Sequence, residues 1–224
     1  MMTIDDQRAL WRVQLALECK AFDDAGRLVP VPCADPDPLP TCYVVRYSDG
    51  STELAFAATS PPWFVDLIGR RGTDDLIDQP QALVEQLQTL GHSIGVGHFH
   101  TYRFDDNTPV QPQAITHDGP ETYSIVIDGL AVAGASSSRS NDSAAELWIE
   151  TQAAHRGHGY ATILAQVWAA DVQQSAKIAF YSHLHENAAS AALVRRLKVS
   201  PLFEIIAFNL MSSLGLRPPA AGPS

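Results

Sequence analysis

The sequence is short of positive charge and of long apolar segments. Its 224 residues include 25 Asp and Glu against 15 Lys and Arg, which gives a formal net charge of −10 at pH 7. A chain with this balance lacks the basic faces that broad binding to DNA, RNA or anionic membranes requires. No window approaches the ~18 uninterrupted apolar residues of a membrane span. We therefore expect neither nucleic acid nor a membrane among its partners.

Cysteine is also scarce. Cys19, Cys33 and Cys42 are odd in number and irregular in spacing, which favours reduced thiols over a disulfide framework. Cys33 and Cys42 alone lack partners at the spacing of a zinc site. The first ten residues contain two aspartates and no apolar core of a signal peptide. Together these features predict a cytoplasmic protein.

Residues 1–120 show helical and hairpin patterns without a motif that names a function. Five prolines in residues 30–40 predict an extended loop, and residues 105–120 are loop-like. Asp49-Gly50 is typical of a hairpin turn. The periodicity predicts helices over 6–20, 61–70 and 79–90 and strands over 42–47, 52–57 and 96–104.

Residues 121–210 carry sharper signals, and residues 211–224 form a tail rich in Pro, Ala, Gly and Ser that we expect to be disordered. Asp128-Gly129 predicts a second hairpin turn. The pattern predicts strands over 123–127, 130–135, 145–151, 177–183 and 202–210, helices over 159–172 and 188–197, and a polar loop over 136–144.

The most informative segment is a strand that runs into Arg156-Gly157-His158-Gly159-Tyr160-Ala161, where a helix opens. The first amides of a helix lack intrahelical partners and carry the positive end of its dipole. Small residues at 157, 159 and 161 allow a phosphate to approach the backbone, and Arg156 adds charge. The segment is neither a Walker loop nor a dinucleotide fingerprint, because no Gly-Lys-Ser/Thr follows and Thr162 replaces the third glycine.

Arg156-x-x-Gly159-x-Ala161 resembles the Arg/Gln-x-x-Gly-x-Gly/Ala pyrophosphate loop of GNAT acetyltransferases. Asn187-x-x-Ser190, after a strand ending in Tyr-Ser, resembles a second landmark of that family, most like a bacterial subgroup with RGxGYA and YS…N-x-x-S motifs. The resemblance covers residues 121–210. It implies an α/β fold with a mixed twisted central sheet and helices on both faces, on which an N-terminal segment of extra helices and a hairpin packs.

The resemblance also implies acetyl-CoA as co-substrate. An amine of a small molecule or a protein would attack the thioester directly in a ternary complex, and the protein would be a monomer or a homodimer. The pantetheine would pair with the backbone near Ile149–Thr151. The implied cofactor-binding residues are Ile149, Thr151, Arg156, Gly157, His158, Gly159, Tyr160, Ala161, Asn187 and Ser190.

Two carboxylates are candidate catalytic residues. Glu146 resembles the base of histone-type family members, with a spacing that differs by about one residue, and Glu150 lies on the same strand face. The alternative is that both are solvated strand carboxylates. Asn187 likewise fits an ordinary helix N-cap.

Histidines raise a second alternative, a metal-dependent hydrolase. The candidate ligands are the histidines at positions 98, 100, 155, 158, 183 and 185. We expect no metal there, because no Asp, Glu or Cys partner stands at a convincing spacing. His183 is also a candidate acid or base.

One departure from the family pattern bears on catalysis. Val194 stands where many members carry a tyrosine that reprotonates the thiolate, and Leu197-Lys198-Val199 replaces the usual Leu-Gly-Phe. This departure motivates a third alternative, a noncatalytic acyl-CoA-binding protein with a sensing or scaffolding role.

The negative charge is unevenly distributed. Residues 1–150 contain 22 acidic and 9 basic residues, whereas residues 151–224 contain 3 acidic and 6 basic residues. If the acidic half lines the acceptor cleft, a cationic amine is favoured over an anionic one.

Overall fold

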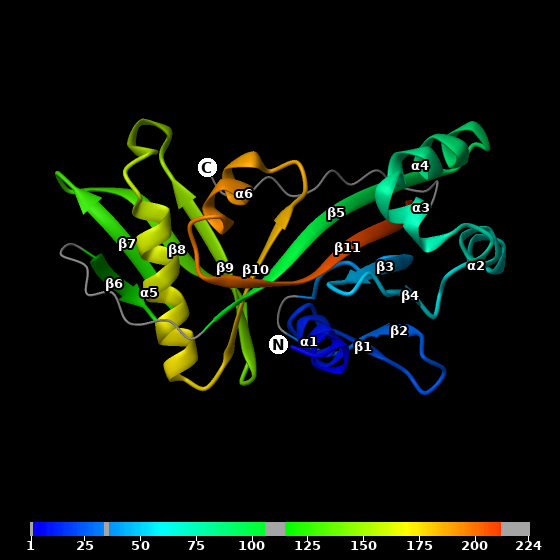
Figure 1. The fold of residues 1–224 in the computed structure, drawn as a ribbon, viewed down its shortest axis with the longest axis horizontal. Helices are drawn as coiled ribbons and strands as arrows, with labels where there is room; N and C mark the ends of the chain where they lie inside the picture. The colour runs from blue at the N-terminus through cyan, green and yellow to red at the C-terminus, as the bar shows by residue number, and fades with distance from the viewer. Residues whose placement is uncertain (1, 34–35, 106–114, 212–224) are drawn as a thin grey trace.

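The computed structural model describes residues 2–33, 36–105 and 115–211, which form a nine-stranded mixed sheet, a two-stranded sheet and helices on both faces (Figure 1). The helices are α1 (Ile4–Leu17), α2 (Pro62–Gly69), α3 (Thr73–Asp78), α4 (Pro80–Thr89), α5 (Tyr160–Gln174) and α6 (Ala188–Val194). The small sheet pairs β1 (Lys20–Phe22) with β2 (Leu28–Pro30). The predicted α/β class with a mixed sheet is confirmed.

The large sheet has the order β4-β3-β11-β5-β10-β9-β8-β7-β6. Its strands are β3 (Cys42–Tyr47), β4 (Thr52–Phe56), β5 (Ser93–Phe104), β6 (Ile115–Gly119), β7 (Thr122–Ile127), β8 (Leu130–Ser140), β9 (Ala144–Thr151), β10 (Ile178–Leu184) and β11 (Val199–Met211). Every neighbouring pair is antiparallel except β9 and β10, which are parallel. Helix α5 provides the crossover that a parallel pair needs.

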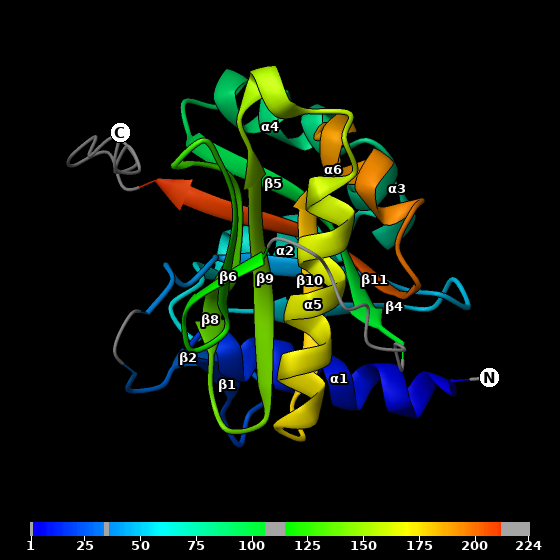
Figure 2. The ribbon, with the colours of Figure 1, turned by 90° about the vertical axis from the view of Figure 1, so that its left-hand side faces the viewer.

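Helices cover both faces of this sheet. Trp11 and Leu15 of α1 are fully buried against one face, with β3 and β11. Trp168 of α5 is fully buried against the other face, over β7 to β10 (Figure 2). Helices α2 to α4 lie on the same face of the sheet as α5. Ile94 of β5 packs with α2 to α4, and Phe104 of β5 packs with α5. Because side chains alternate along a strand, these two even-numbered residues point to the same face.

Residues from both ends of the chain share this sheet. Strand β11 lies between β3 and β5, and its pairing with β5 runs from Val199↔Phe104 to Met211↔Ser93 with one register shift between Pro201 and Phe203. Strand β5 joins β11 to β10, and β3 and β4 continue the sheet beyond β11, so the first 105 residues are not a separate layer. Residues 105–120, which were expected to be loop-like, are described only in part, and their last part forms β6, which pairs with β7.

Both predicted hairpins are present, and Gly50 and Gly129 have the positive φ of 85° and 79° that their turns require. The predicted polar loop over residues 136–144 is wrong, since β8 continues to Ser140. Its polar side chains have partners that composition does not reveal. Trp168 Nε1 donates to Ser137 Oγ at 3.0 Å, and Ser138 Oγ donates to the Glu146 carbonyl at 3.1 Å.

Several element boundaries also differ from the sequence prediction. The first helix ends at Leu17 rather than residue 20, and β1 follows. The helix expected over 188–197 ends at Val194. Helix α3 was not predicted, because its six residues are too short to show a periodic pattern. The predicted disordered tail lies outside the described residues, except Met211.

The prediction of reduced thiols is wrong for two of the three cysteines. Cys19 and Cys33 form a disulfide, with their Cα atoms 5.9 Å apart, because the β1–β2 hairpin brings the chain back beside the end of α1. Cys42 is a buried free thiol. The cysteine count therefore gives no support for a reducing compartment. Among the described residues, no helix is both long and apolar enough to cross a membrane.

Trp168→Ala is expected to lower the free energy of unfolding by about 3–5 kcal/mol, because it removes a fully buried indole and leaves a cavity. The matched control is Trp148→Ala, whose side chain is 48% exposed; its loss is expected to stay within about 0.5 kcal/mol. Guanidinium unfolding followed by far-UV circular dichroism measures both. Equal losses would contradict the core assigned to α5.

Candidate functional site

The parallel strands β9 and β10 separate partway along their length. Their pairing runs from Ile178↔Ala144 to Phe180↔Glu146 and ends there. Beyond that point β9 stays paired with β8 and β10 stays paired with β5, so the two strands diverge (Figure 1). The edge of β9 after Glu146 therefore has backbone groups that face an opening instead of a strand.

A cleft of about 600 Å³ occupies this opening. Leu147, Trp148 and Ile149 line it from β9, and residues of β10 line it from the other side. Asn187 and Ser190, at the start of α6, also line it. The cleft thus joins the separated strands to the first turn of the helix that follows β10.

The predicted phosphate loop lies just past the end of β9, where α5 begins. Gly157 and Gly159 have φ of 83° and 80°, a backbone conformation that residues with a Cβ atom rarely adopt. Gly159 is the N-cap residue of α5, and no side chain of the described residues caps that helix. The first amides of α5 are therefore available to an anion. These loop residues are not part of the lining of the cleft.

Two side chains of the loop are held by its own backbone. Arg156 is exposed, and its Nε donates to the Thr151 carbonyl at 3.2 Å. His158 Nδ1 lies 3.1 Å from the carbonyl oxygens of His155 and Arg156, and its ring stacks on Tyr160. The guanidinium of Arg156 thus stays at the surface beside the free amides.

Asn187 and Ser190 form a helix cap. Asn187 Oδ1 accepts a hydrogen bond from Ser190 N at 3.0 Å, so the ordinary capping role is present. The hydroxyl of Tyr181 interacts with the Ser190 side chain, and burial raises the pKa of that tyrosine. Of the other two predicted pantetheine contacts, Ile149 lines the cleft, whereas Thr151 does not. Thr151 Oγ1 is buried and has no hydrogen-bond partner among the residues that the structure describes.

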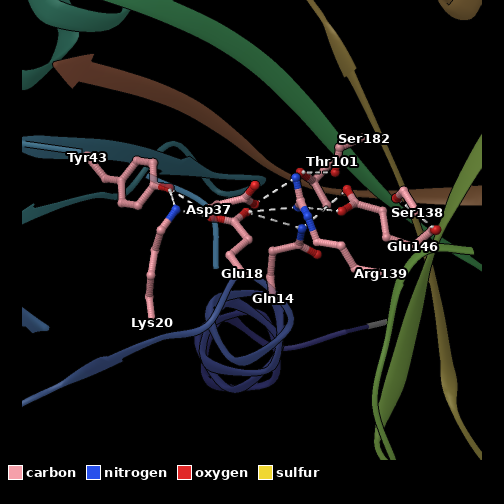
Figure 3. Close-up of polar contacts among 10 residues, drawn as sticks. All are labelled: Gln14, Glu18, Lys20, Asp37, Tyr43, Thr101, Ser138, Arg139, Glu146 and Ser182. Carbon is pink, nitrogen blue, oxygen red and sulfur yellow. Dashed lines mark hydrogen bonds and ion pairs between the residues drawn. The ribbon is translucent and has the colours of Figure 1, made fainter. Parts of the chain in front are cut away.

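Glu146 lies in the same cleft, where β9 and β10 part. It is 4% exposed, and its Oε2 is 2.7 Å from Arg139 Nη1 (Figure 3). Gln14 Nε2, from α1, donates to its Oε1 at 3.3 Å. Burial raises the pKa of Glu146, and the positive charge of Arg139 opposes that rise. The two candidate carboxylates are separated, because Glu150 is exposed and does not line the cleft.

Arg139 connects Glu146 to two further carboxylates. Its Nη2 is 2.8 Å from Asp37 and its Nη1 is 3.8 Å from Glu18. Asp37 lies after β2 and Glu18 at the end of α1, so this charged group depends on residues over a hundred positions from Glu146.

Lys20 and Tyr43 extend the group from Glu18. Lys20 Nζ lies 2.8 Å from Glu18 Oε2, and the Tyr43 hydroxyl donates to the same oxygen at 2.8 Å. Burial raises the pKa of Tyr43, so the phenol keeps its proton. Figure 3 shows these residues converging from α1, β1, β3, β8 and β9.

Sequence reasoning missed most of this charged group. Arg139 fell in a stretch predicted to be a loop, and Gln14, Glu18 and Lys20 belong to a segment predicted as a helix of unclear role. No spacing rule connects them to Glu146. The premise that the histidines lack an acidic partner also fails, since Glu204 Oε1 is 2.5 Å from His98 Nε2.

No protein-family model and no curated protein matches the sequence. Solved structures with a similar fold include the following three. A GNAT-family acetyltransferase from Colwellia psychrerythraea has a TM-score of 0.47 at 11% identity, over 94% of this chain and 98% of that chain. A GCN5-related N-acetyltransferase-like protein from Streptococcus suis 89/1591 has a TM-score of 0.49 at 13% identity, over 93% of this chain and 100% of that chain. A GCN5-related N-acetyltransferase from Kribbella flavida has a TM-score of 0.43 at 14% identity, over 70% of this chain and 78% of that chain. Likenesses this weak assign neither a family nor an activity.

Arg139→Gln is expected to lower the free energy of unfolding by about 3 kcal/mol near neutral pH, because it leaves Glu146 buried without its counter-charge. The loss is expected to shrink below about pH 4, where carboxyls are protonated in the folded and unfolded chains alike. Urea unfolding at both pH values measures the change.

The control is Arg8→Gln. Arg8 lies 3.9 Å from Asp5 in a pair whose side chains are 49% and 89% exposed, and its loss is expected to stay below about 1 kcal/mol. An Arg139 variant no less stable than this control would show that the buried pair contributes nothing to folding.

Proposed function

We propose that this protein is an N-acetyltransferase that uses acetyl-CoA and transfers its acetyl group to an amine. The observation that carries the proposal is the separation of β9 and β10 directly after Glu146↔Phe180. It leaves a strand edge and a buried carboxylate around one opening, and the free amides of α5 follow just past the end of β9. These are the parts needed to hold a thioester with a phosphate tail beside a proton acceptor.

Three features fit acetyl-CoA. The uncapped first turn of α5 and the positive-φ Gly157 and Gly159 would hold its pyrophosphate, with Arg156 adding charge. The free edge of β9 near Ile149 would hydrogen-bond its pantetheine, with Asn187 and Ser190 beside it. When bound, acetyl-CoA supplies an activated acyl group, and an amide of the β9 edge would stabilise the oxyanion that develops on its carbonyl.

Glu146 is the proposed proton acceptor. An aliphatic amine with a pKa of about 10.4 is mostly protonated at neutral pH, so it must lose a proton before it attacks. The buried carboxyl has a raised pKa, which makes it a stronger base, while Arg139 favours its ionised form. The amine could lose its proton to Glu146 directly or through water.

The charged group favours a cationic acceptor. Glu18, Asp37 and Glu146 supply three carboxylates against the two cations Arg139 and Lys20. A small or protein-borne ammonium group would be attracted to this excess of negative charge. Acidic acceptors should therefore be poorer substrates.

The second candidate function is noncatalytic binding of an acyl-CoA. Val194 in the place of the family's tyrosine supports it, as does the engagement of both Glu146 oxygens by Arg139 and Gln14. The two candidates share the cofactor site and differ only in turnover.

Gly159→Val is expected to weaken acetyl-CoA binding by at least about tenfold, which corresponds to about 1.4 kcal/mol. The variant places a branched side chain at the free amides and strains a backbone with φ of 80°. The matched control is Gly26→Val, which carries similar strain at φ of 73° in the β1–β2 turn, also with open space around it. Isothermal titration with acetyl-CoA measures both. An absence of binding by the unmodified chain at millimolar acetyl-CoA would reject both candidate functions.

Glu146→Gln is expected to lower turnover by roughly 10²–10⁴-fold, the contribution typical of a general base, with acetyl-CoA affinity unchanged. Thiol release from acetyl-CoA is measured across primary amines and lysine peptides. The control is Glu85→Gln, on the exposed surface of α4. Retained turnover in the Glu146 variant would remove its catalytic role, and silence of the unmodified chain across the panel would favour the noncatalytic candidate.

A further inference from the structure

Three histidines and one glutamate converge on the face of the sheet opposite to α1. His98 and His100 extend from β5, Glu204 from β11, and His185 from the turn after β10. One ligand atom from each of the four lies within 4.8 Å of the others. We propose that His98, His100, His185 and Glu204 bind a divalent transition metal, best matched by Zn²⁺.

The donor atoms already face one another. His98 Nε2 lies 2.5 Å from Glu204 Oε1, and His100 Nε2 lies 2.9 Å from His185 Nδ1. The rings of His98 and His185 stack with centroids 4.3 Å apart. A tetrahedral Zn²⁺ with bonds of about 2.0–2.1 Å holds its donors about 3.3 Å apart. The two close pairs would have to move apart by less than about 1 Å, and the other pairs, all within 4.8 Å, would have to move together by at most about 1.5 Å, to complete the site.

The chemistry of the donors selects the class of metal. Three imidazoles and one carboxylate suit Zn²⁺ and other transition ions, whereas Ca²⁺ and Mg²⁺ require oxygen ligands. Four protein ligands leave no open position, which is typical of a structural zinc site.

Outer contacts orient the glutamate. Arg46 donates from Nε and Nη2 to Oε2 of Glu204, at 3.0 and 2.7 Å, and Asp78 binds Arg46 at 2.8 Å. The second oxygen, Oε1, is left facing His98. Outer-shell groups of this kind fix the geometry of metal ligands. A shallow cleft of about 330 Å³ that reaches His100 and Glu204 offers an entry path.

The proposed metal site is distinct from the cleft between β9 and β10. Phe99 and Thr101 of β5 line the cleft, and the alternation of side chains directs His98 and His100 to the opposite face. A metal here would join β5 and β11 to the turn that leads into α6. His185 N already donates to the His98 carbonyl at 2.8 Å, so the metal would reinforce an existing junction.

The test uses the full chain stripped of metal with a chelator and titrated with Zn²⁺ alone. We expect one equivalent to bind and to raise the melting temperature. His185→Ala removes an exposed ligand without opening the core, and should weaken Zn²⁺ binding by more than the roughly 10–100-fold that an outer-shell loss costs. His117→Ala, at an exposed histidine of β6 remote in the sheet order, is the matched control and should bind like the unmodified chain.

Substitution with Co²⁺ gives a second readout, because a four-coordinate ion absorbs visible light far more strongly than a hydrated one. We expect this absorption in the unmodified chain and in His117→Ala, and its loss in His185→Ala. Failure to bind one equivalent of Zn²⁺, or equal binding by the His185 and His117 variants, would overturn the proposal. Neither result depends on acetyl-CoA, so the metal site and the proposed function are judged separately.

Discussion

The single parallel pair in the sheet, β9 and β10, sets the geometry on which the candidate site depends. Parallel neighbours need a crossover, so α5 must begin at the carboxyl end of β9 and return the chain to the start of β10. This places the free amides of α5 at the edge where the two strands end. Because pairing stops at Glu146↔Phe180, that same edge is open. Cofactor and acceptor would therefore meet where the sheet itself is incomplete.

An incomplete sheet exposes polar groups that the fold must satisfy in another way. Glu146 sits at the last paired position and is buried, which would be costly without a partner. Arg139 compensates its charge from β8, and Gln14 reaches it from α1. The N-terminal helix thus does more than cover an apolar face, since it completes the polar wall of the cleft. Removing α1 would expose both the core around Trp11 and the buried carboxylate.

Local signals in the sequence were enough for the parts of the fold that depend on neighbours along the chain. The hairpin turns at Asp49-Gly50 and Asp128-Gly129 and the glycine turn before α5 follow from backbone conformations that few residues adopt. The charged group around Arg139 and the histidine group around Glu204 were beyond this reasoning. Both combine residues from separate elements, and their proximity depends on tertiary packing, with α1 on the sheet for Gln14 and Glu18 and β11 beside β5 for Glu204. The Cys19–Cys33 disulfide was missed for a different reason, because the local β1–β2 turn between its cysteines had no recognised signal.

The distribution of charge along the cleft now has a structural basis. Glu18 and Asp37, from the acidic half of the chain, line the cleft at one end of the proposed substrate path, whereas Arg156 and the free amides of α5 lie past the end of β9, outside the cleft lining, at the other end. In the proposed reaction a polyanionic cofactor and a cationic amine would each be attracted to a different end. Each would also be repelled from the end that the other occupies. In the proposed reaction this polarity would separate the two substrates before any contact specific to the acceptor is made, and it would favour a cationic amine whatever the rest of its structure.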